Sequence, residues 1–313
     1  MNGMIAVTDY DWFRHLSSVK NLDEVNFWRP SDIRKPSLRE GSPVIFKLRK
    51  PFGGWIVGYG VFVRHDVFPA WLAWQNFEEK NGAPSFPEMR RRIERLRSDT
   101  PEARKSAGDY LIGCLMLSEP CFFADSEWIR PPAEWPENTV QGKTYDLSVG
   151  EGARVWQELL ARDPRLRMGE SGRDSRKEDA GRFGPPILVH PRRGQGIFRS
   201  EVMAAYGRAC AVTSEHSLPV LEAAHIRPYA DEGVHEVSNG ILLRSDIHRL
   251  FDKGYVAVDP KHHFIVSNRL REDFENGRTY YPLHGQLIAL PGSADHHPDP
   301  VHLHWHLQEC FKG

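Results

Sequence analysis

Cysteine is scarce in this sequence: it has four among 313 residues, and they lie far apart. This excludes a small secreted scaffold held by disulfides, and Cys114, Cys121, Cys210 and Cys310 are expected to be reduced thiols of a cytoplasmic protein. Long apolar runs are lacking too, since no stretch reaches the roughly 18 apolar residues of a membrane span. The first residues show no basic segment followed by an apolar core, so neither a secretory signal nor a membrane partner is expected.

The sequence also lacks an excess of either charge. Its 41 Lys and Arg residues balance 42 Asp and Glu residues, so a surface for nucleic acid would need a local excess of basic residues. Residues 162–199 supply one, with ten Lys and Arg against five Asp and Glu. We predict a basic linker at 164–195, in which Arg192 and Arg193 contact DNA phosphates; the alternative is a solvated linker without a partner.

The length and the hydrophobic share of 40% are sufficient for two cores. We therefore predict one domain at 1–163 and another at 196–313, on either side of that linker.

In the second domain, residues 219–226 form an apolar run without a helical stripe, which predicts a buried strand that carries His225 near its end. After a polar loop, Asn239 and Gly240 form a turn dipeptide that tolerates positive φ, and residues 241–244 predict a second strand. Ser245 is a suitable N-cap for a short helix at 246–253.

This arrangement would place His225 on a strand opposite His248 on the helix. Such a pair suits phosphodiester hydrolysis, because a neutral histidine can take a proton from water while a divalent ion held from the helix polarises the phosphate. A lone histidine at a strand end is more often structural than catalytic. For His225, the residues around it favour a catalytic role.

The segments AAHIRPY, NGILLRSDIHRLFD and GYVAVD resemble the HNH nucleases, whose fold is the ββα-metal finger. The resemblance implies that His225 is the general base, that Asn239 fixes the loop and orients the base, and that His248 binds a divalent ion, Mg²⁺ or Mn²⁺. It also implies double-stranded DNA as the substrate, with Arg227 and Arg249 as contacts to the DNA backbone.

The sequence departs from that family at two places. The residue before the base is often Asp or His in the family, and here it is Ala224. Period-two alternation puts Glu222 on the same strand face, so Glu222 is the first candidate for a second metal ligand, with Asp246 and then Asp252 behind it. Many relatives carry cysteine pairs for a structural zinc; here only Cys210 stands at the matching place, so no structural zinc is expected.

The first domain is predicted to be α+β, a small curled sheet or partly open barrel with helices. Strands are expected at 43–48, 55–64 and 110–123, helices at 70–80, 87–97 and 152–162, and a short helical or irregular lead-in at 1–22. Gly58 and Gly60 within a strand indicate a bulge, a barrel bend or the close approach of a ligand.

This half resembles PUA-like modules, in the group with the EVE and SRA domains that read modified bases. The residues that carry the resemblance lie at 27–31, 43–60, 112–114, 120–123 and 138–145. The resemblance implies that a flipped base enters an aromatic pocket. By position the pocket residues would be Trp28, Ser31, Trp55, Asn138, Gln141 and Tyr145. For each tryptophan the alternative is packing in the core.

Together the two halves resemble type IV restriction endonucleases, which cut DNA that carries modified cytosine. Cutting both strands would call for two active sites and hence a homodimer. Two alternatives stay open: an HNH nuclease whose N-terminal domain senses a nucleotide or a protein, and a DNA-binding protein without catalysis.

Overall fold

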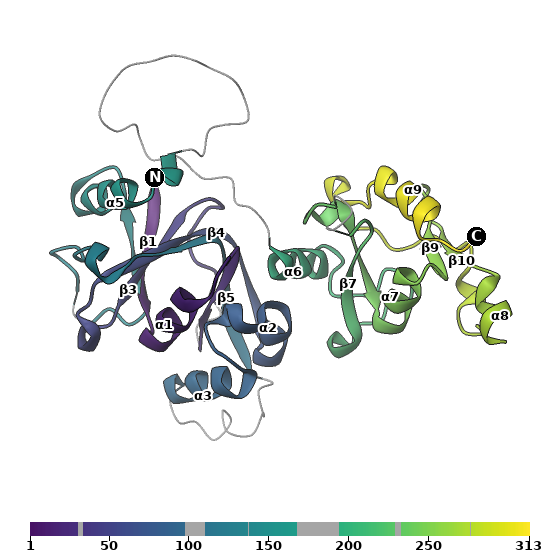
Figure 1. The fold of residues 1–313 in the computed structure, drawn as a ribbon, viewed down its shortest axis with the longest axis horizontal. Coiled ribbons are helices and arrows are strands. Elements are labelled where there is room, and N and C mark those ends of the chain that lie inside the picture. The colour runs from purple at the N-terminus through teal and green to yellow at the C-terminus, as the bar shows by residue number, and fades with distance from the viewer. Residues whose placement is uncertain (31–33, 98–109, 137, 168–193, 229–232, 276) are drawn as a thin grey trace, which may run out of the picture. The chain divides into compact units, whose positions relative to one another are not determined.

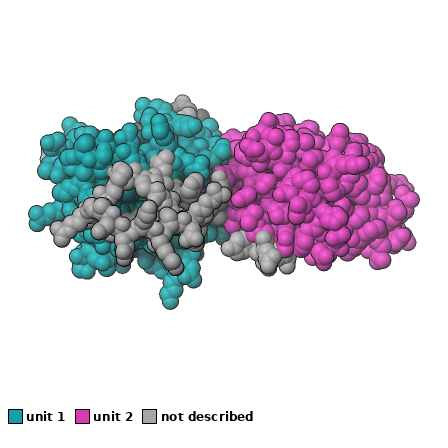
Figure 2. Space-filling view, turned by 90° about the horizontal axis from the view of Figure 1, so that it is seen from above, with its two compact units in different colours: residues 1–194 teal, residues 195–313 magenta. Residues whose placement is uncertain are grey.

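The structure is a computed structural model that describes residues 1–313 except 31–33, 98–109, 137, 168–193, 229–232 and 276 (Figure 1). The chain divides into two compact units, residues 1–194 and 195–313, which Figure 2 colours separately. Both contain helices and strands, so the α+β class is confirmed. No helix in the described ranges is long and apolar enough to cross a membrane.

Unit 1 is built on a mixed sheet of six strands. In spatial order they are β2 (Glu24–Arg29), β5 (Leu111–Phe122), β4 (Ile56–Pro69), β3 (Pro43–Leu48), β1 (Asn2–Thr8) and β6 (Gly142–Asp146). β1 and β3 run parallel, and every other neighbouring pair runs antiparallel. A PUA-like subtype stays a prediction, because the strand order alone does not define it.

The expectation of a helical or irregular lead-in at 1–22 was wrong for its first part. β1 lies inside the sheet between β3 and β6, and Ile5 and Ala6 are fully buried. Its apolar stretch is too short to reveal a strand, and the pairing that makes it one comes from residues 43–48 and 142–146, which are distant in sequence.

Helices cover both faces of this sheet. Ile45 and Phe46 are consecutive residues of β3 and so point to opposite faces. Ile45 belongs to a core cluster with Trp156 of α5 (Gly150–Arg162). Phe46 packs edge-on against Trp12 of α1 (Tyr10–Ser18), with ring centroids 5.1 Å apart. Among its described residues the unit also contains α2 (Ala70–Phe77) and α3 (Phe86–Leu96).

The glycines predicted to mark a bulge do so. The pairing of β4 with β5 shifts register between Tyr59 and Val61, at Gly60. Gly58 has φ +159°, and a Cβ there would lie 2.2 Å from the carbonyl oxygen of Cys121. Only glycine lets the two strands approach this closely.

Unit 1 extends beyond the predicted end at residue 163. Leu166, in a 3₁₀ turn at Pro164–Arg167, is buried in the same core cluster as Trp156. Asp163 accepts a hydrogen bond from Tyr59 Oη at 2.7 Å and pairs with Arg165 at 2.6 Å. These contacts attach the start of the predicted linker to the sheet; most of that linker lies outside the described residues.

Unit 2 contains the predicted hairpin followed by a helix. Its elements are α6 (Gln195–Ala205), β7 (Leu221–His225), β8 (Gly240–Arg244), α7 (Ser245–Asp252), β9 (Val256–Val258), β10 (Phe264–Val266), α8 (Arg269–Phe274) and α9 (Pro300–Glu309). β7 pairs antiparallel with β8, and α7 packs beside β7 (Figure 1). Ser245 begins the helix rather than capping it, since the N-cap position is Arg244.

Candidate functional site

The hairpin of unit 2 places His225 at the last position of β7, directly across from Gly240 of β8. Gly240 is extended, with φ −132°, so its tolerance of positive φ is not used here. Glycine is required there for another reason: a Cβ would lie 2.5 Å from Val202 and 2.9 Å from Phe198. The absent side chain lets α6 approach the hairpin closely.

That approach positions the ring of His225. Phe198 of α6 is fully buried and stacks on the imidazole with a centroid distance of 3.9 Å and an interplanar angle of 15°. No local pattern predicts this partner, because Phe198 belongs to a helix 27 positions upstream of the motif histidine. One face of the imidazole is therefore covered by an apolar ring.

The surroundings keep His225 neutral. Burial lowers its pKa, and the positive charges of His235, Arg199 and His248 lower it further, to about 4, against a small opposing effect of Asp252. A histidine with this pKa is unprotonated at neutral pH. It can therefore accept a proton, as a general base must.

His235 is a second residue that the sequence reasoning missed. Its Nδ1 lies 3.1 Å from Nε2 of His225, and the ring centroids are 5.1 Å apart. It comes from the polar loop between the two strands, where a single histidine gives no pattern. Only the folded loop brings it to the edge of the His225 ring.

Asn239 is fully buried and fixes that loop. Its Oδ1 accepts a hydrogen bond from the amide of Arg227, and its Nδ2 donates to the carbonyl oxygens of Arg227 and Val234, each at 2.9 Å. The amide thus holds loop backbone. It has no described contact with His225, so any effect on the base passes through the loop.

His248, on α7, lies between two carboxylates. Its Nδ1 is 2.7 Å from Oε2 of Glu222, and its Nε2 is 3.4 Å from Oδ1 of Asp252. Burial alone would lower its pKa, yet the hydrogen bonds and charges of Asp252 and Glu222 outweigh burial and raise it.

These donors suit a divalent ion. Imidazole nitrogen and carboxylate oxygen are the ligand types that Mn²⁺ and related ions accept, and Mg²⁺ favours carboxylates. In the described part of the chain, no three or more His, Cys, Asp or Glu residues already converge as a ligand set. Glu222 and His248 instead hydrogen-bond to each other. A bound ion would lie between these two side chains, with both as ligands.

Asp246 does not join them. Its carboxylate accepts hydrogen bonds from Arg244 Nε at 2.7 Å and from Tyr280 Oη at 2.9 Å. The hydrogen bond from Arg244 is the largest cause of its lowered pKa, which falls to about 2. Asp252, which the sequence ranked below Asp246, is the one that reaches His248, because residues four apart share a helix face and residues two apart do not.

The predicted backbone contacts have mixed surroundings. Arg249 is exposed on α7, and the guanidinium of Arg227 lies 5.4 Å from the ring centroid of Trp305. Arg192 and Arg193 lie outside the described residues. Cys210 is buried, and its sulfur accepts a hydrogen bond from the amide of Arg244 at 3.3 Å.

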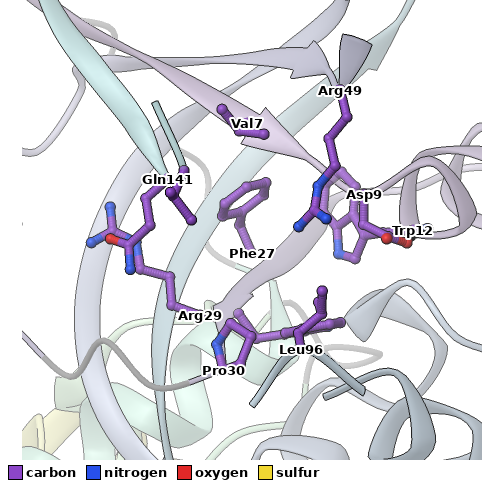
Figure 3. Close-up of a pocket in the computed structure, with 11 residues that line it drawn as sticks. Val7, Asp9, Trp12, Phe27, Arg29, Pro30, Arg49, Leu96 and Gln141 are labelled. Atoms are coloured by element: carbon purple, nitrogen blue, oxygen red, sulfur yellow. Dashed lines mark hydrogen bonds between the residues drawn. The ribbon is translucent and has the colours of Figure 1, made fainter. Parts of the chain in front are cut away.

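Unit 1 has a pocket of its own, with a volume of about 250 Å³. Figure 3 shows Phe27 between two polar groups: Arg29 and Gln141 on one side, Asp9 and Arg49 on the other. The full lining is Val7, Asp9, Trp12, Phe27, Trp28, Arg29, Pro30, Arg49, Leu96, Val140 and Gln141. Aromatic walls with a few polar groups are typical of a site for a flat ligand.

Two of the six residues predicted for a base pocket, Trp28 and Gln141, line this one. Trp28 is also a core residue, since its Nε1 donates to the carbonyl oxygen of Asn81 at 2.8 Å. The pocket contains further polar residues, Asp9, Arg29 and Arg49, that the sequence did not single out.

The other candidates lie elsewhere. Tyr145 packs with Trp135 against the core cluster that contains Trp156. This cluster lies on the face of the sheet opposite to Trp12. Asn138 is exposed, Trp55 is half-buried, and neither lines the pocket. Ser31 falls outside the described residues.

Comparison with known proteins bears on unit 2 first. No curated protein matches the chain. A solved structure described as "Modification dependent TagI restriction endonuclease" is similar at 15% identity, covering 93% of this chain and 76% of that chain, with a TM-score of 0.30. That score is too low to carry an argument about fold or function. Residues 210–259, in contrast, match the HNH endonuclease family. The segment that contains His225, Asn239 and His248 is thus an HNH endonuclease domain.

Proposed function

We propose that this protein is a DNA endonuclease in which unit 2 hydrolyses phosphodiester bonds and unit 1 restricts cutting to DNA with a modified cytosine. The observation that carries the proposal is the pair of histidines in the HNH domain. His225 is held neutral against Phe198, while His248 is flanked by Glu222 and Asp252.

In the hydrolysis, His225 removes a proton from a water molecule as the water oxygen attacks phosphorus. The new bond forms between that oxygen and phosphorus, the bond from phosphorus to the leaving sugar oxygen breaks, and the leaving oxygen takes a proton from solvent water. Glu222 and His248 would hold a divalent ion, Mg²⁺ or Mn²⁺, with Asp252 beside them. When bound, the ion stabilises negative charge on the phosphate and the leaving oxygen.

Arg227 and Arg249 are proposed to contact the DNA backbone. Phosphate contacts position a protein on DNA and carry no sequence information, so an active site of this kind needs discrimination from elsewhere. The basic stretch with Arg192 and Arg193 would add affinity of the same non-specific kind.

The pocket of unit 1 is proposed to supply that discrimination by taking up a flipped base. Phe27, Trp12 and Trp28 give it apolar aromatic walls. The carboxylate of Asp9 can accept a hydrogen bond from an exocyclic amino group. The amide of Gln141 can both donate and accept. A cytosine with an added group at C5 presents the amino group on one edge and the added group against the apolar walls.

The experiment is cleavage of matched duplexes that carry cytosine, 5-methylcytosine or 5-hydroxymethylcytosine, with Mg²⁺ or Mn²⁺. We expect cutting of a modified duplex and little of the unmodified one. Equal cutting of all three would overturn the proposal that unit 1 recognises a modified base, while the proposed nuclease activity of unit 2 would stand. Absence of cutting with either metal would favour a DNA-binding protein without catalysis.

A second candidate rests on the two arginines of the pocket. Arg29 is largely buried and Arg49 reaches in from the opposite side, so the pocket offers positive charge that suits a phosphate-bearing ligand. Binding of a nucleotide in this pocket would then activate DNA cleavage by unit 2. Cutting of unmodified DNA only after a nucleotide is added would favour this alternative.

Cleavage of both strands would require two copies of unit 2, which suggests a homodimer on DNA. Sedimentation with and without a short cleavable duplex tests this. A single copy of the chain on a duplex that is cut in both strands would contradict it.

A further inference from the structure

The loop between β7 and β8 is closed so that it returns to the base. Asn239 binds the backbone of Arg227, two residues after His225, and of Val234, one residue before His235. Gly233 supports the closure: its amide donates to the carbonyl oxygen of Pro228 at 3.0 Å, and a Cβ on it would lie 2.0 Å from the carbonyl oxygen of Arg227. The two ends of the loop are therefore tied together, and His235 meets His225.

The contact between the two imidazoles restricts their protons. A neutral imidazole carries one N–H and one lone pair in the ring plane. With Nε2 of His225 3.1 Å from Nδ1 of His235, one nitrogen must donate and the other accept. The contact therefore has two arrangements.

Only one arrangement leaves a usable base. If His235 donates, the lone pair of His225 is engaged at Nε2 and its own proton sits on Nδ1, so no lone pair remains for water. If His225 donates from Nε2, its Nδ1 keeps a lone pair. Phe198 covers one face of the ring, and the contact at the ring edge places Nε2, not Nδ1, against His235.

We propose that His235 is a positioning residue that accepts the Nε2 proton of His225 and so holds His225 in the tautomer whose Nδ1 removes a proton from water. This inference rests on the proposed function of His225 as the base. It also gives the buried Asn239 a specific task, which is to carry His235 to the base.

The same contact assists after proton transfer. Once Nδ1 has taken the proton, His225 is a cation with two N–H groups, and the bond from Nε2 to neutral His235 becomes charge-assisted and stronger. A protonated His235 would oppose a charge on His225, as Arg199 and His248 do, whereas Asp252 favours it, so the assistance requires neutral His235. His235 is the one that contacts the ring nitrogen directly.

The test compares His235→Leu with His235→Asn in the full chain. Leucine removes the acceptor, whereas the Oδ1 of asparagine can occupy the place of Nδ1. Because positioned general bases contribute about 10² to 10⁴-fold, we expect kcat for His235→Leu to fall roughly 10 to 100-fold with little change in KM for DNA. His235→Asn is expected to recover most of the loss. Equal, wild-type rates in both variants would overturn the role of His235.

A spectroscopic measurement reads the tautomer of His225 in the wild-type protein. Wild-type protein labelled with ¹⁵N-histidine is recorded by NMR, and the spectrum of His225→Ala identifies the signals of His225. We expect a protonated Nε2 and an unprotonated Nδ1. A proton on Nδ1 would overturn the proposal whatever the variants show.

Different results would contradict the roles proposed for His225 and for His235. Cutting that survives His225→Ala overturns the proposed function of His225. The wrong tautomer in wild-type protein, with cutting still lost in His225→Ala, overturns the role of His235 alone.

Discussion

The candidate sites of the two units are assembled over very different distances along the chain. In unit 2, Glu222, His225, Asn239 and His248 lie on one hairpin and the helix that follows it. In unit 1, the pocket draws on residues from Val7 to Gln141, which belong to several strands, helices and connections. The first site is local and its residue spacing is visible in the sequence, whereas the second exists only after distant segments have paired.

Removing the local site while leaving the distant one intact is expected to have the largest effect. In His225→Ala the proton acceptor is lost, so the cleavage rate should fall by at least about 100-fold, while affinity for modified DNA stays near that of wild type. Cleavage and binding are measured on the same duplex. His304→Ala, on the exposed side of α9, is the matched control and should cut normally.

The converse change removes one polar group from the distant site. Gln141→Ala should lower the preference for modified over unmodified DNA by roughly 5- to 150-fold, because one good pair of contacts to a base edge contributes ~1–3 kcal/mol of discrimination. The maximal rate on saturating DNA should stay close to wild type. The ratio of the two specificity constants, kcat/KM, is the quantity to measure.

Asn138→Ala is the control for that experiment. Asn138 is exposed and does not line the pocket, although its sequence neighbourhood made it as good a candidate as Gln141. An equal loss of preference in both variants would move the reading of the base out of the pocket.

The same contrast explains what could be predicted. The hairpin, the helix and the positions of His225 and His248 followed from a buried apolar run, turn residues and a helix start, all of which are local signals. Phe198 and His235 could not be found this way, because a helix and a loop bring them to the base only in the folded unit. Asp252 was underrated beside Asp246 for a related reason: Arg244 and Tyr280 already engage Asp246.

In unit 1, local sequence patterns predicted the structure correctly where they were strong. They failed where a strand forms only by pairing with segments distant in sequence. The bulge at Gly60 followed from glycines inside a strand, whereas the close approach at Gly58 is to the backbone of β5 and not to a ligand. β1 was missed because its partners are distant in sequence. Tyr145 was misplaced because its strand could be recognised only through its pairing with β1, which turns its ring toward the core.

A smaller effect tests how closely the local site depends on its own packing. Gly240→Ala places a methyl group against Phe198 and Val202, and overpacking of this kind costs about 1–3 kcal/mol. We expect the free energy of unfolding of unit 2 to fall by that amount and the cleavage rate to fall with it, since Phe198 also supports His225. Gly292→Ala, where a Cβ meets nothing within 4 Å, is the control for thermal unfolding. An unchanged unfolding temperature in Gly240→Ala would contradict the close contact.

An effect that appears only on acidification concerns the stability of unit 2. His306 of α9 is buried, stacks on Phe251 with centroids 3.7 Å apart and bonds its carbonyl oxygen at 3.1 Å; burial lowers its pKa to about 4. Unfolded histidine takes a proton near pH 6.5, so between pH 6.5 and 4 the unfolded state binds more protons, and the free energy of unfolding falls as the pH is lowered.

For His306 alone the fall is about 1 kcal/mol for each pH unit crossed. His306→Phe keeps a ring against Phe251 but cannot be protonated, so denaturant titrations should show a shallower loss of stability between pH 6.5 and 4 than in wild type. His304→Phe, at an exposed position of the same helix, should leave the pH dependence as it is. An unchanged slope in His306→Phe would show that His306 is protonated as easily in the folded unit as in the unfolded chain, which its burial against Phe251 makes energetically unfavourable.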